Sequence, residues 1–320
     1  MRKQIVVIGS NSFSGSDFID LLLDRGNYHV LGISRSREKD ALFLPYKRRH
    51  QSAFRFYQYD LNHDYAKIFR LLNRFKPEYV VNFSALSEVA VSWQYPEDYY
   101  AINTAAVIRL ANFLKKAPYL KRYVHISTPE VYGTCVGKVT ETAPLNPSTP
   151  YAASKAAGDL FLLTLVKNNR FPLVMIRSTN VYGVHQQLYK IIPRSIIYIK
   201  LGKLIELHGG GKAIKSFIHI RDVTRAILAA MEKGQIGEIY HVSPDKSYSV
   251  REIVTRICQK MGVKTGKVSR TTAERPGQDA AYIIDSSKLR TTLGWEPRVT
   301  LESGLAEVID WISNNWPEIK

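Results

Sequence analysis

Short apolar runs alternate with longer amphipathic stretches along the first 180 residues of the chain. Runs rich in β-branched, aliphatic or aromatic side chains lie at residues 4–8, 28–33, 55–59, 79–83, 123–126 and 173–177. Such runs are typical of strands buried in a parallel sheet. Stretches with the hydrophobic period of helices lie between them, at residues 16–25, 67–75, 104–115 and 151–167. This alternation predicts an α/β fold with the doubly wound parallel sheet of a Rossmann domain.

The pattern changes after residue 180, where the expected strands become shorter and basic and aromatic residues interleave. We therefore expect two domains. Residues 1–180 would form a dinucleotide-binding Rossmann domain, and residues 181–320 a smaller mixed α/β domain for the substrate. A chain of 320 residues is long enough for one large or two modest cores.

Candidate chemistry follows the expected strand at residues 123–126. This strand runs into Ser127-Thr128-Pro129-Glu130, which supplies two hydroxyls and a carboxylate. Ligands of open α/β sheets bind at the carboxyl ends of strands. Tyr151 and Lys155 are four residues apart at the start of a helical run, so both project from one helix face. A phenol has a pKa near ~10, and a neighbouring ammonium favours the phenolate, so the pair predicts an acid–base tyrosine.

The segment Ser127-Thr128-x-Glu130-Val131-Tyr132-Gly133, followed by Tyr151-x-x-x-Lys155, resembles the extended short-chain dehydrogenase/reductases. The similar branch contains the 4,6-dehydratases and epimerases of nucleotide sugars, such as the dTDP-glucose and GDP-mannose 4,6-dehydratases. The resemblance runs over residues 4–312. It implies an enzyme that oxidises C4 with bound NAD(P), eliminates water across C5–C6 and returns hydride to C6, giving a 4-keto-6-deoxy sugar. It also implies that a late strand, Gly237–Val242, joins the main sheet, and that the second domain binds the nucleotide sugar.

The resemblance implies four catalytic residues, Thr128, Glu130, Tyr151 and Lys155. Tyr151 would take the proton of the C4 hydroxyl while Thr128 hydrogen-bonds the same oxygen. Lys155 would hold the nicotinamide ribose and lower the pKa of Tyr151, and Glu130 would remove the C5 proton. The dTDP-glucose enzymes carry an Asp before the Glu, whereas this chain has Pro129. Other dehydratases, the GDP-mannose type among them, keep only the Glu and resemble this chain better at that point. We therefore hypothesise that Glu130 both takes the C5 proton and protonates the departing C6 hydroxyl.

The segment Gly9-Ser10-Asn11-Ser12-Phe13-Ser14-Gly15 occupies the place of the family's three-glycine dinucleotide turn. In such folds this turn brings the pyrophosphate to the N-terminus of a helix. Ser12 replaces the middle glycine, and its small side chain predicts a slightly displaced loop that still binds. The resemblance assigns the cofactor to Gly9, Asn11, Ser12, Phe13, Ser14, Gly15, Ser34, Arg35, Arg37, Asp60, Leu61, Phe83, Ser84, Ala85, Ser87, Asn103, Ser127, Tyr151 and Lys155.

The end of the second expected strand bears on the choice between NAD and NADP. An NAD site usually has an acidic residue there to hold the ribose hydroxyls, but this chain has Ser34. Arg35 and Arg37 could pair with a 2′-phosphate, so we favour NADP over NAD; the alternative is a solvated basic loop. Asn62 or Asp64 would cap the next helix, which leaves Asp60 for the adenine.

The resemblance also implies the substrate contacts. Glu88 replaces a histidine of the family's sugar pocket, so contacts there would differ. Arg275 lies in an Arg-Pro-Gly segment whose arginine would meet the diphosphate, although a surface turn is the alternative. The expected substrate residues are Ser87, Glu88, Thr128, Pro129, Glu130, Asn180, Arg194, Lys215 and Arg275.

Composition limits the remaining classes. No apolar run approaches the ~20 residues of a membrane helix, and no signal peptide is recognisable at the N-terminus. Two cysteines offer neither a disulfide framework nor a metal site, so we expect a cytoplasmic protein without metal. The net charge of +17 is spread along the chain, so we expect no nucleic-acid or membrane partner. The family pairs subunits in a four-helix bundle, which implies a homodimer through the helices from Ala101 and Tyr151.

Three other functions stay open at this point. A C4 epimerase of the same fold needs the Ser/Thr hydroxyl, Tyr151 and Lys155, but it does not need Glu130. A decarboxylase or reductase of the same fold is a second alternative. A non-enzymatic, cofactor-sensing role is a third, because Ser12, Val184 and Ser216 depart from the family pattern.

Overall fold

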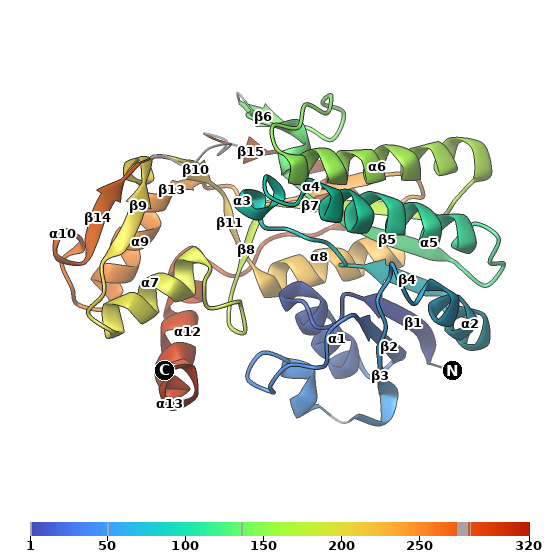
Figure 1. Cartoon of the computed structure of the whole chain (residues 1–320), viewed down its shortest axis with the longest axis horizontal. Coiled ribbons are helices and arrows are strands. Elements are labelled where there is room, and N and C mark those ends of the chain that lie inside the picture. The colour runs from blue at the N-terminus through green and yellow to red at the C-terminus, as the bar shows by residue number, and fades with distance from the viewer. Residues whose placement is uncertain (1, 50, 136, 274–280, 282) are drawn as a thin grey trace.

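The computed structural model describes residues 2–49, 51–135, 137–273, 281 and 283–320 (Figure 1). Its centre is a seven-stranded sheet in the order β12-β7-β5-β4-β1-β2-β3, in which all neighbours are parallel. The strands are β1 (Lys3–Ile8), β2 (Tyr28–Ser34), β3 (Phe54–Gln58), β4 (Tyr79–Asn82), β5 (Arg122–Ser127), β7 (Leu173–Ser178) and β12 (Ile239–Val242). The predicted parallel sheet is confirmed, and the late strand β12 joins it beside β7.

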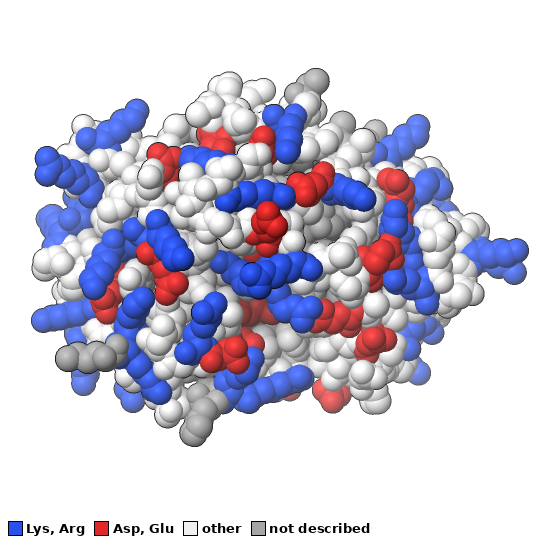
Figure 2. All heavy atoms as spheres, turned by 180° about the vertical axis from the view of Figure 1, so that it is seen from behind, with Lys and Arg blue, Asp and Glu red and all other residues white. Residues whose placement is uncertain are grey.

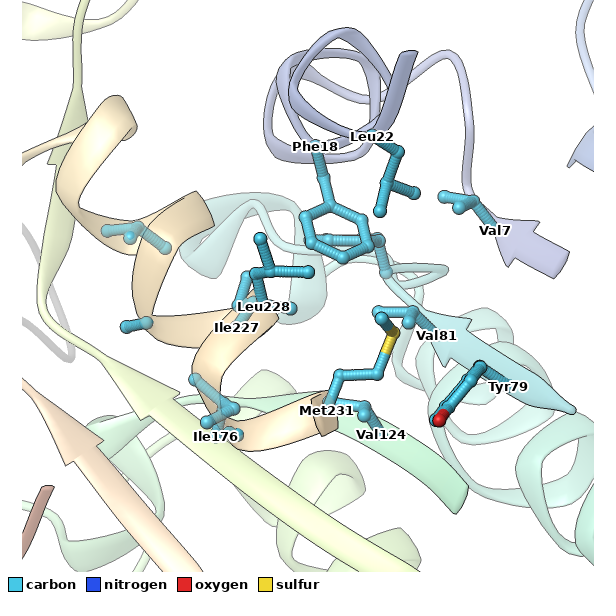
Figure 3. Close-up of a cluster of buried hydrophobic side chains, with 14 of the residues drawn as sticks. Val7, Phe18, Leu22, Tyr79, Val81, Val124, Ile176, Ile227, Leu228 and Met231 are labelled. Carbon is cyan, nitrogen blue, oxygen red and sulfur yellow. The ribbon is translucent and has the colours of Figure 1, made fainter. Parts of the chain in front are cut away.

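Helices cover both faces of this sheet because alternate residues of each strand point to opposite sides. On one face, Val7 of β1 packs with Phe18 of α1 (Phe13–Arg25) and Ile227 of α8 (Ile220–Lys233), as Figure 3 shows. On the other face, Val6 and Ile8 belong to the core formed with three helices. These are α2 (Tyr65–Phe75), α5 (Val107–Leu114) and α6 (Pro150–Asn169). The buried strands therefore read as continuous apolar runs.

A second group of elements lies beside the sheet, at the left of Figure 1. It contains α7 (Ile191–Lys200), α9 (Val250–Lys260), α10 (Thr265–Val268), α12 (Leu301–Asn314) and α13 (Trp316–Ile319). Its short strands pair as β9 (Ile205–His208) with β14 (Ser269–Thr272), β8 (Asn180–Tyr182) with β11 (Phe217–His219), and β10 (Ile214–Lys215) with β13 (Tyr248–Ser249). Three further elements complete the fold: β6 (Lys138–Val139) pairs with β15 (Ile283–Ile284), and α11 (Ser287–Leu293) contacts β12 and α8.

Charged side chains cover the reverse face of the molecule. Figure 2 shows Lys and Arg spread over this face with Asp and Glu among them. Ion pairs occur among the charged side chains of the protein, for example Lys288 with Glu238 and Arg290 with Asp245. Within the described ranges, no helix is long and apolar enough to cross a membrane.

The helix predicted over residues 104–115 is wrong at its start. Residues Ala101–Ala106 form a π-helix, η3, which continues from α4 (Pro96–Tyr100) into α5. The side chain of Asn103 explains the wider turn, because it is held on two sides. Its amide donates to Leu86 O and Ser154 Oγ, both at 3.0 Å, and its oxygen accepts from Leu86 N at 3.0 Å. This contact joins the loop after β4 to α6.

Close packing of η3 against α6 depends on Gly158. A Cβ at this position would lie 2.6 Å from the Asn103 carbonyl oxygen. Gly158→Ala should therefore force the helices apart and lower the free energy of unfolding by roughly 1–3 kcal/mol, measured by urea denaturation. Gly266→Ala is the matched control, because nothing lies within 4 Å of a Cβ there. Equal unfolding midpoints for both variants would contradict this packing.

Candidate active site

The carboxylate of Glu130 is placed by a tight turn at the end of β5. Thr128 caps the 3-10 helix η4 (Pro129–Tyr132), and its Oγ1 accepts from Glu130 N at 3.2 Å. Pro129 suits the first position of the turn because its φ is fixed. Gly133 ends the turn at a φ of +67°, and a Cβ there would lie 2.2 Å from Asn146 O. The Thr-Pro-Glu sequence therefore fixes both the hydroxyl and the carboxylate.

Tyr151 meets these two groups from the first turn of α6. Thr149 caps this helix by accepting from Ala152 N at 3.1 Å, and Pro150 begins it. The Tyr151 phenol is buried, hydrogen-bonds Thr128 and lies within the electrostatic range of the Glu130 carboxylate. Tyr99 packs edge-on against its ring, with 6.2 Å between centroids. The structure thus brings Thr128, Glu130 and Tyr151 together.

The pKa values of this site differ from the sequence-based expectation. Burial raises the pKa of Tyr151, and the Glu130 carboxylate raises it further, while the Thr128 hydrogen bond opposes both. The sequence predicted a lowered pKa for Tyr151. In the structure, its surroundings together raise this pKa. Lys155 Nζ donates to Ile126 O at 2.8 Å and lies 3.3 Å from His125 Nε2. Burial lowers the pKa of Lys155 to about 8.

The glycine turn after β1 closes on its own backbone. Ser12 caps α1: its Oγ accepts from Gly15 N at 3.1 Å and donates to Gly9 O at 2.6 Å. Gly9 has a φ of +82°, and a Cβ there would lie 2.9 Å from the Phe83 carbonyl carbon and Ser84 N. The serine that departs from the family pattern is therefore the helix cap.

A pocket of about 610 Å³ opens at the carboxyl ends of β1, β2 and β4. Its walls include many of the expected cofactor residues: Gly9, Asn11, Ser12, Ser34, Arg35, Asp60, Leu61, Phe83, Ser84, Ala85 and Ser87. Glu88, expected to contact the substrate, lines it too. The residues expected to be catalytic (Thr128, Glu130, Tyr151 and Lys155) do not line this pocket, but Tyr99, which packs on Tyr151, does.

The residues of this pocket fit a dinucleotide. The N-terminus of α1 faces it with the Ser12 turn, where a helix favours phosphate. Buried Asn11 Oδ1 has no hydrogen-bond partner among the described residues, so an acceptor is left for a ligand. The close approach of Gly9 to Phe83 and Ser84 keeps the floor clear of side chains. A bound dinucleotide would be held by these groups.

Several expected residues lie elsewhere. Phe13, Ser14 and Gly15 form the first turn of α1, and Asn103 and Ser127 are buried behind the pocket. Asn180 Nδ2 donates to Ser216 O at 3.3 Å on β8, Arg194 lies on α7 and Lys215 on β10. Arg275 falls outside the described residues.

The structure gives Arg37 and Asp60 contacts that the sequence did not predict. Arg37 is not a lining residue; its carbonyl accepts from Asn11 Nδ2 at 2.8 Å, and Lys39 lines the pocket beside Arg35 instead. Asp60 Oδ1 accepts from Asn62 N at 2.7 Å, so this oxygen is used within its own turn. Asp64 stands at the start of α2, yet its carboxylate makes no cap and accepts from Asp60 N.

Two functional candidates were missed from the sequence. Tyr189 OH donates to Glu88 Oε1 at 3.0 Å, and Lys190 faces the carboxylates of Glu88 and Glu130. Burial lowers the pKa of Lys190. In the sequence, these two residues are a tyrosine–lysine pair directly before the apolar run of α7. The direction in which their side chains point cannot be predicted from their spacing.

Comparison with known proteins agrees with this site. Residues 6–308 match the model of the family described as GDP-mannose 4,6 dehydratase. A dTDP-glucose 4,6-dehydratase of Xanthomonas campestris pv. campestris is 34% identical over 270 residues, covering 79% of this chain and 77% of that protein. A dTDP-D-glucose 4,6-dehydratase of Homo sapiens is 28% identical over 322 residues, covering 98% and 91%.

Solved structures give the same result. DesIV, a dTDP-glucose 4,6-dehydratase from Streptomyces venezuelae with NAD bound, has a TM-score of 0.91 at 29% identity and covers 99% of this chain and 98% of its own. A UDP-glucuronic acid 4-epimerase from Bacillus cereus with NAD bound has a TM-score of 0.89 at 27% identity, covering 97% and 99%. Fold and site therefore define an extended short-chain dehydrogenase/reductase that acts on nucleotide sugars. Within that class, the chain belongs to the GDP-mannose 4,6-dehydratase family, as the resemblance predicted.

Proposed function

We propose that this protein is a nucleotide-sugar 4,6-dehydratase in which Glu130 is the acid–base group for the elimination. The observation that carries this proposal is that the charge of the Glu130 carboxylate acts on the Tyr151 phenol, which is itself hydrogen-bonded to Thr128. Oxidation at C4 needs the tyrosine and the threonine, whereas loss of water across C5–C6 also needs a carboxylate. The relatives named as 4,6-dehydratases support the same reaction.

Each residue has a definite task in this reaction. When bound, the dinucleotide accepts a hydride from the sugar and returns one at the end of the cycle. Tyr151 takes the proton of the C4 hydroxyl, and Thr128 holds the same oxygen by a hydrogen bond. Lys155 lies one turn along α6 and contributes a buried positive charge near the phenol. The ammonium would oppose the effects of burial and of the Glu130 charge, both of which raise the pKa of the phenol.

Glu130 then handles both protons of the elimination. The C4 ketone makes the C5 proton acidic, and the carboxylate removes it. Pro129 has no side-chain proton to give, so the proton that Glu130 takes from C5 goes to the C6 oxygen, which leaves as water. After hydride returns to C6, C5 takes a new proton that originates from the solvent. Glu130 and Glu88 both act on the Lys190 ammonium and raise its pKa, against the effect of burial.

The substrate is a nucleoside-diphosphate hexose, and dTDP-glucose is the first to test because the relatives from Xanthomonas campestris and Homo sapiens are named as dTDP-glucose 4,6-dehydratases. Epimerisation at C4 is the second candidate, favoured by the similarity to UDP-glucuronic acid 4-epimerase. Mass spectrometry after incubation with dTDP-, GDP-, CDP- and UDP-hexoses separates the two. A product lighter by one water supports the dehydratase; an unchanged mass with inverted C4 identifies the epimerase.

Glu130→Gln should lower kcat by about 10²–10⁴-fold, because the amide cannot accept the C5 proton. Deuterium from the solvent should also no longer appear at C5, which mass spectrometry detects. Glu97→Gln, an exposed acidic position on α4, is the matched control and should behave as wild type. Retained turnover by Glu130→Gln would exclude this role.

We also propose NADP as the preferred cofactor. Solved structures of similar proteins hold NAD. In this chain β2 ends in Ser34, where an NAD site usually has an acidic residue. Ser34 Oγ accepts from Asn11 N at 3.0 Å, and the cations of Arg35 and Lys39 line the same pocket. Two cations suit the 2′-phosphate of NADP.

Removal of either cation should weaken NADP⁺ binding selectively. A hydrogen bond to a charged group contributes about 1.5–3 kcal/mol, so Arg35→Ala or Lys39→Ala should raise the Kd for NADP⁺ roughly tenfold or more. The Kd for NAD⁺ should change little, which fluorescence titration of both cofactors measures. Arg37→Ala is the control, since Arg37 does not line the pocket. Tighter binding of NAD⁺ than NADP⁺ by the wild type would contradict the proposal.

We propose further that two copies pair through α6 and the η3–α5 helix, in a four-helix bundle. These helices lie side by side on one face of the molecule (Figure 1). Leu160 on α6 and Tyr100 on α4 are 54% and 42% exposed there, which is apolar surface that a partner would cover. The buried thiols of Cys135 and Cys258 are consistent with the reducing cytoplasm that we propose as its location.

Leu160→Arg should convert the dimer to a monomer, because a guanidinium would be buried without a partner. Sedimentation velocity gives the mass directly. Leu204→Arg is the matched control: its side chain is 47% exposed, in the loop between α7 and β9. A monomeric wild type, or a dimer unaffected by Leu160→Arg, would show that this face is not the interface.

A further inference from the structure

A network of fully buried charges lies directly behind the catalytic residues. Lys155 of α6, Asp159 one turn later on the same helix, and Arg177 of β7 are each at most 1% exposed. The proposed reaction uses Lys155 but gives no task to Asp159 or Arg177. Buried charges cost free energy unless they are paired, so their presence calls for a physical reason.

Asp159 connects Lys155 to the end of β5. Its Oδ2 accepts from Ser127 Oγ at 2.6 Å and from Arg177 Nη2 at 2.8 Å. Its Oδ1 accepts no hydrogen bond in the described part of the chain and lies 3.5 Å from His125 Nε2. The same His125 nitrogen lies 3.3 Å from Lys155 Nζ. The carboxylate and the lysine therefore lie beside the same imidazole nitrogen.

Arg177 connects the network to the turn that carries Glu130. Its Nη1 donates to Tyr132 OH at 2.5 Å, and Tyr132 is the last residue of η4. Tyr132 OH also lies 2.7 Å from His241 Nε2. Glu141 adds a negative charge to this network: it acts on the Tyr132 phenol, and its Oε1 accepts from His241 N at 3.0 Å. The segments that carry Thr128, Glu130 and Lys155 all touch this one network.

Its charges do not balance. Lys155 and Arg177 are two cations, and Asp159 is the single carboxylate between them. Burial and the two cations lower the pKa of His125 well below its usual value, so the imidazole is neutral and adds no charge. Asp159 raises the pKa of Lys155, and Arg177 lowers it. The two residues thus act on Lys155 with opposite signs.

We propose that Asp159 and Arg177 are positioning residues that set the proton occupancy of Lys155, Asp159 holding the proton on and Arg177 driving it off. This inference rests on the proposed role of Lys155 as a buried cation near Tyr151. The ammonium form exists below the pKa of Lys155, so activity falls as pH rises through that value. The position of this alkaline limit is set by two side chains that touch no substrate.

Opposite changes follow from neutralising each partner. Asp159→Asn leaves two buried cations, so Lys155 loses its proton at lower pH, and the alkaline limit of kcat moves down by roughly one unit or more. Arg177→Gln leaves Lys155 with Asp159 alone, so the limit moves up. Arg177→Lys keeps the charge and is the matched control, with a limit near that of the wild type.

The direct measurement is an NMR titration of enzyme labelled with ¹³C at Cε of lysine. The Lys155 signal is identified by its absence in Lys155→Arg. The titration midpoint should fall in Asp159→Asn and rise in Arg177→Gln, in parallel with the pH–rate profiles. This readout needs no turnover, so it stands even if none of the nucleotide sugars is dehydrated.

Three results would overturn the proposal. One is a midpoint that stays constant in all variants while kcat falls, which is the outcome of a purely structural role. Another is a shift of the same sign in Asp159→Asn and Arg177→Gln. If Asp159→Asn does not fold, the comparison of Arg177→Gln with Arg177→Lys decides alone, and equal midpoints for these two exclude the proposal.

Discussion

The contact between the end of β5 and the buried face of α6 is the constraint on which the site depends. Lys155 Nζ donates to Ile126 O at 2.8 Å, and Ser127 Oγ donates to Asp159 at 2.6 Å, one helical turn further on. These bonds fix the helix relative to the strand, so Tyr151 at the start of α6 meets Thr128 just beyond β5. The parallel sheet then places the glycine turn after β1 at the same edge, where ligands of this fold bind.

The family and the sheet could be predicted from the sequence because both depend on local patterns. Each strand of the first six in the main sheet lies within one residue of a predicted apolar run, and periodicity alone identified α1, α2 and α6 to within a few residues. The π-helix η3 could not be foreseen, because it depends on contacts of Asn103 with Leu86 and Ser154, 17 and 51 residues away along the chain.

The electrostatics of the site were the least predictable part. Spacing placed Lys155 one turn from Tyr151, but the pKa of the phenol also depends on burial and on Glu130, and both raise it. Lys190 and Lys39 escaped notice for the same reason, since the direction of a side chain before a helix or in a loop is set by tertiary packing. The consequence of Pro129 was the easiest to predict, because a side chain without an ionisable group cannot donate a proton in any environment.

The departures from the family pattern are accommodated by local structure. Ser12 acts as the cap of α1, and Pro129 begins the turn that holds Glu130. The central claim is that hydride leaves C4 and returns to C6 of the same sugar, and ²H NMR of the product from C4-deuterated nucleotide-hexose tests it most directly. The account predicts deuterium in the C6 methyl group of a 4-keto product. Deuterium retained at C4, in a product that keeps its C6 hydroxyl, would contradict the dehydratase and identify an epimerase.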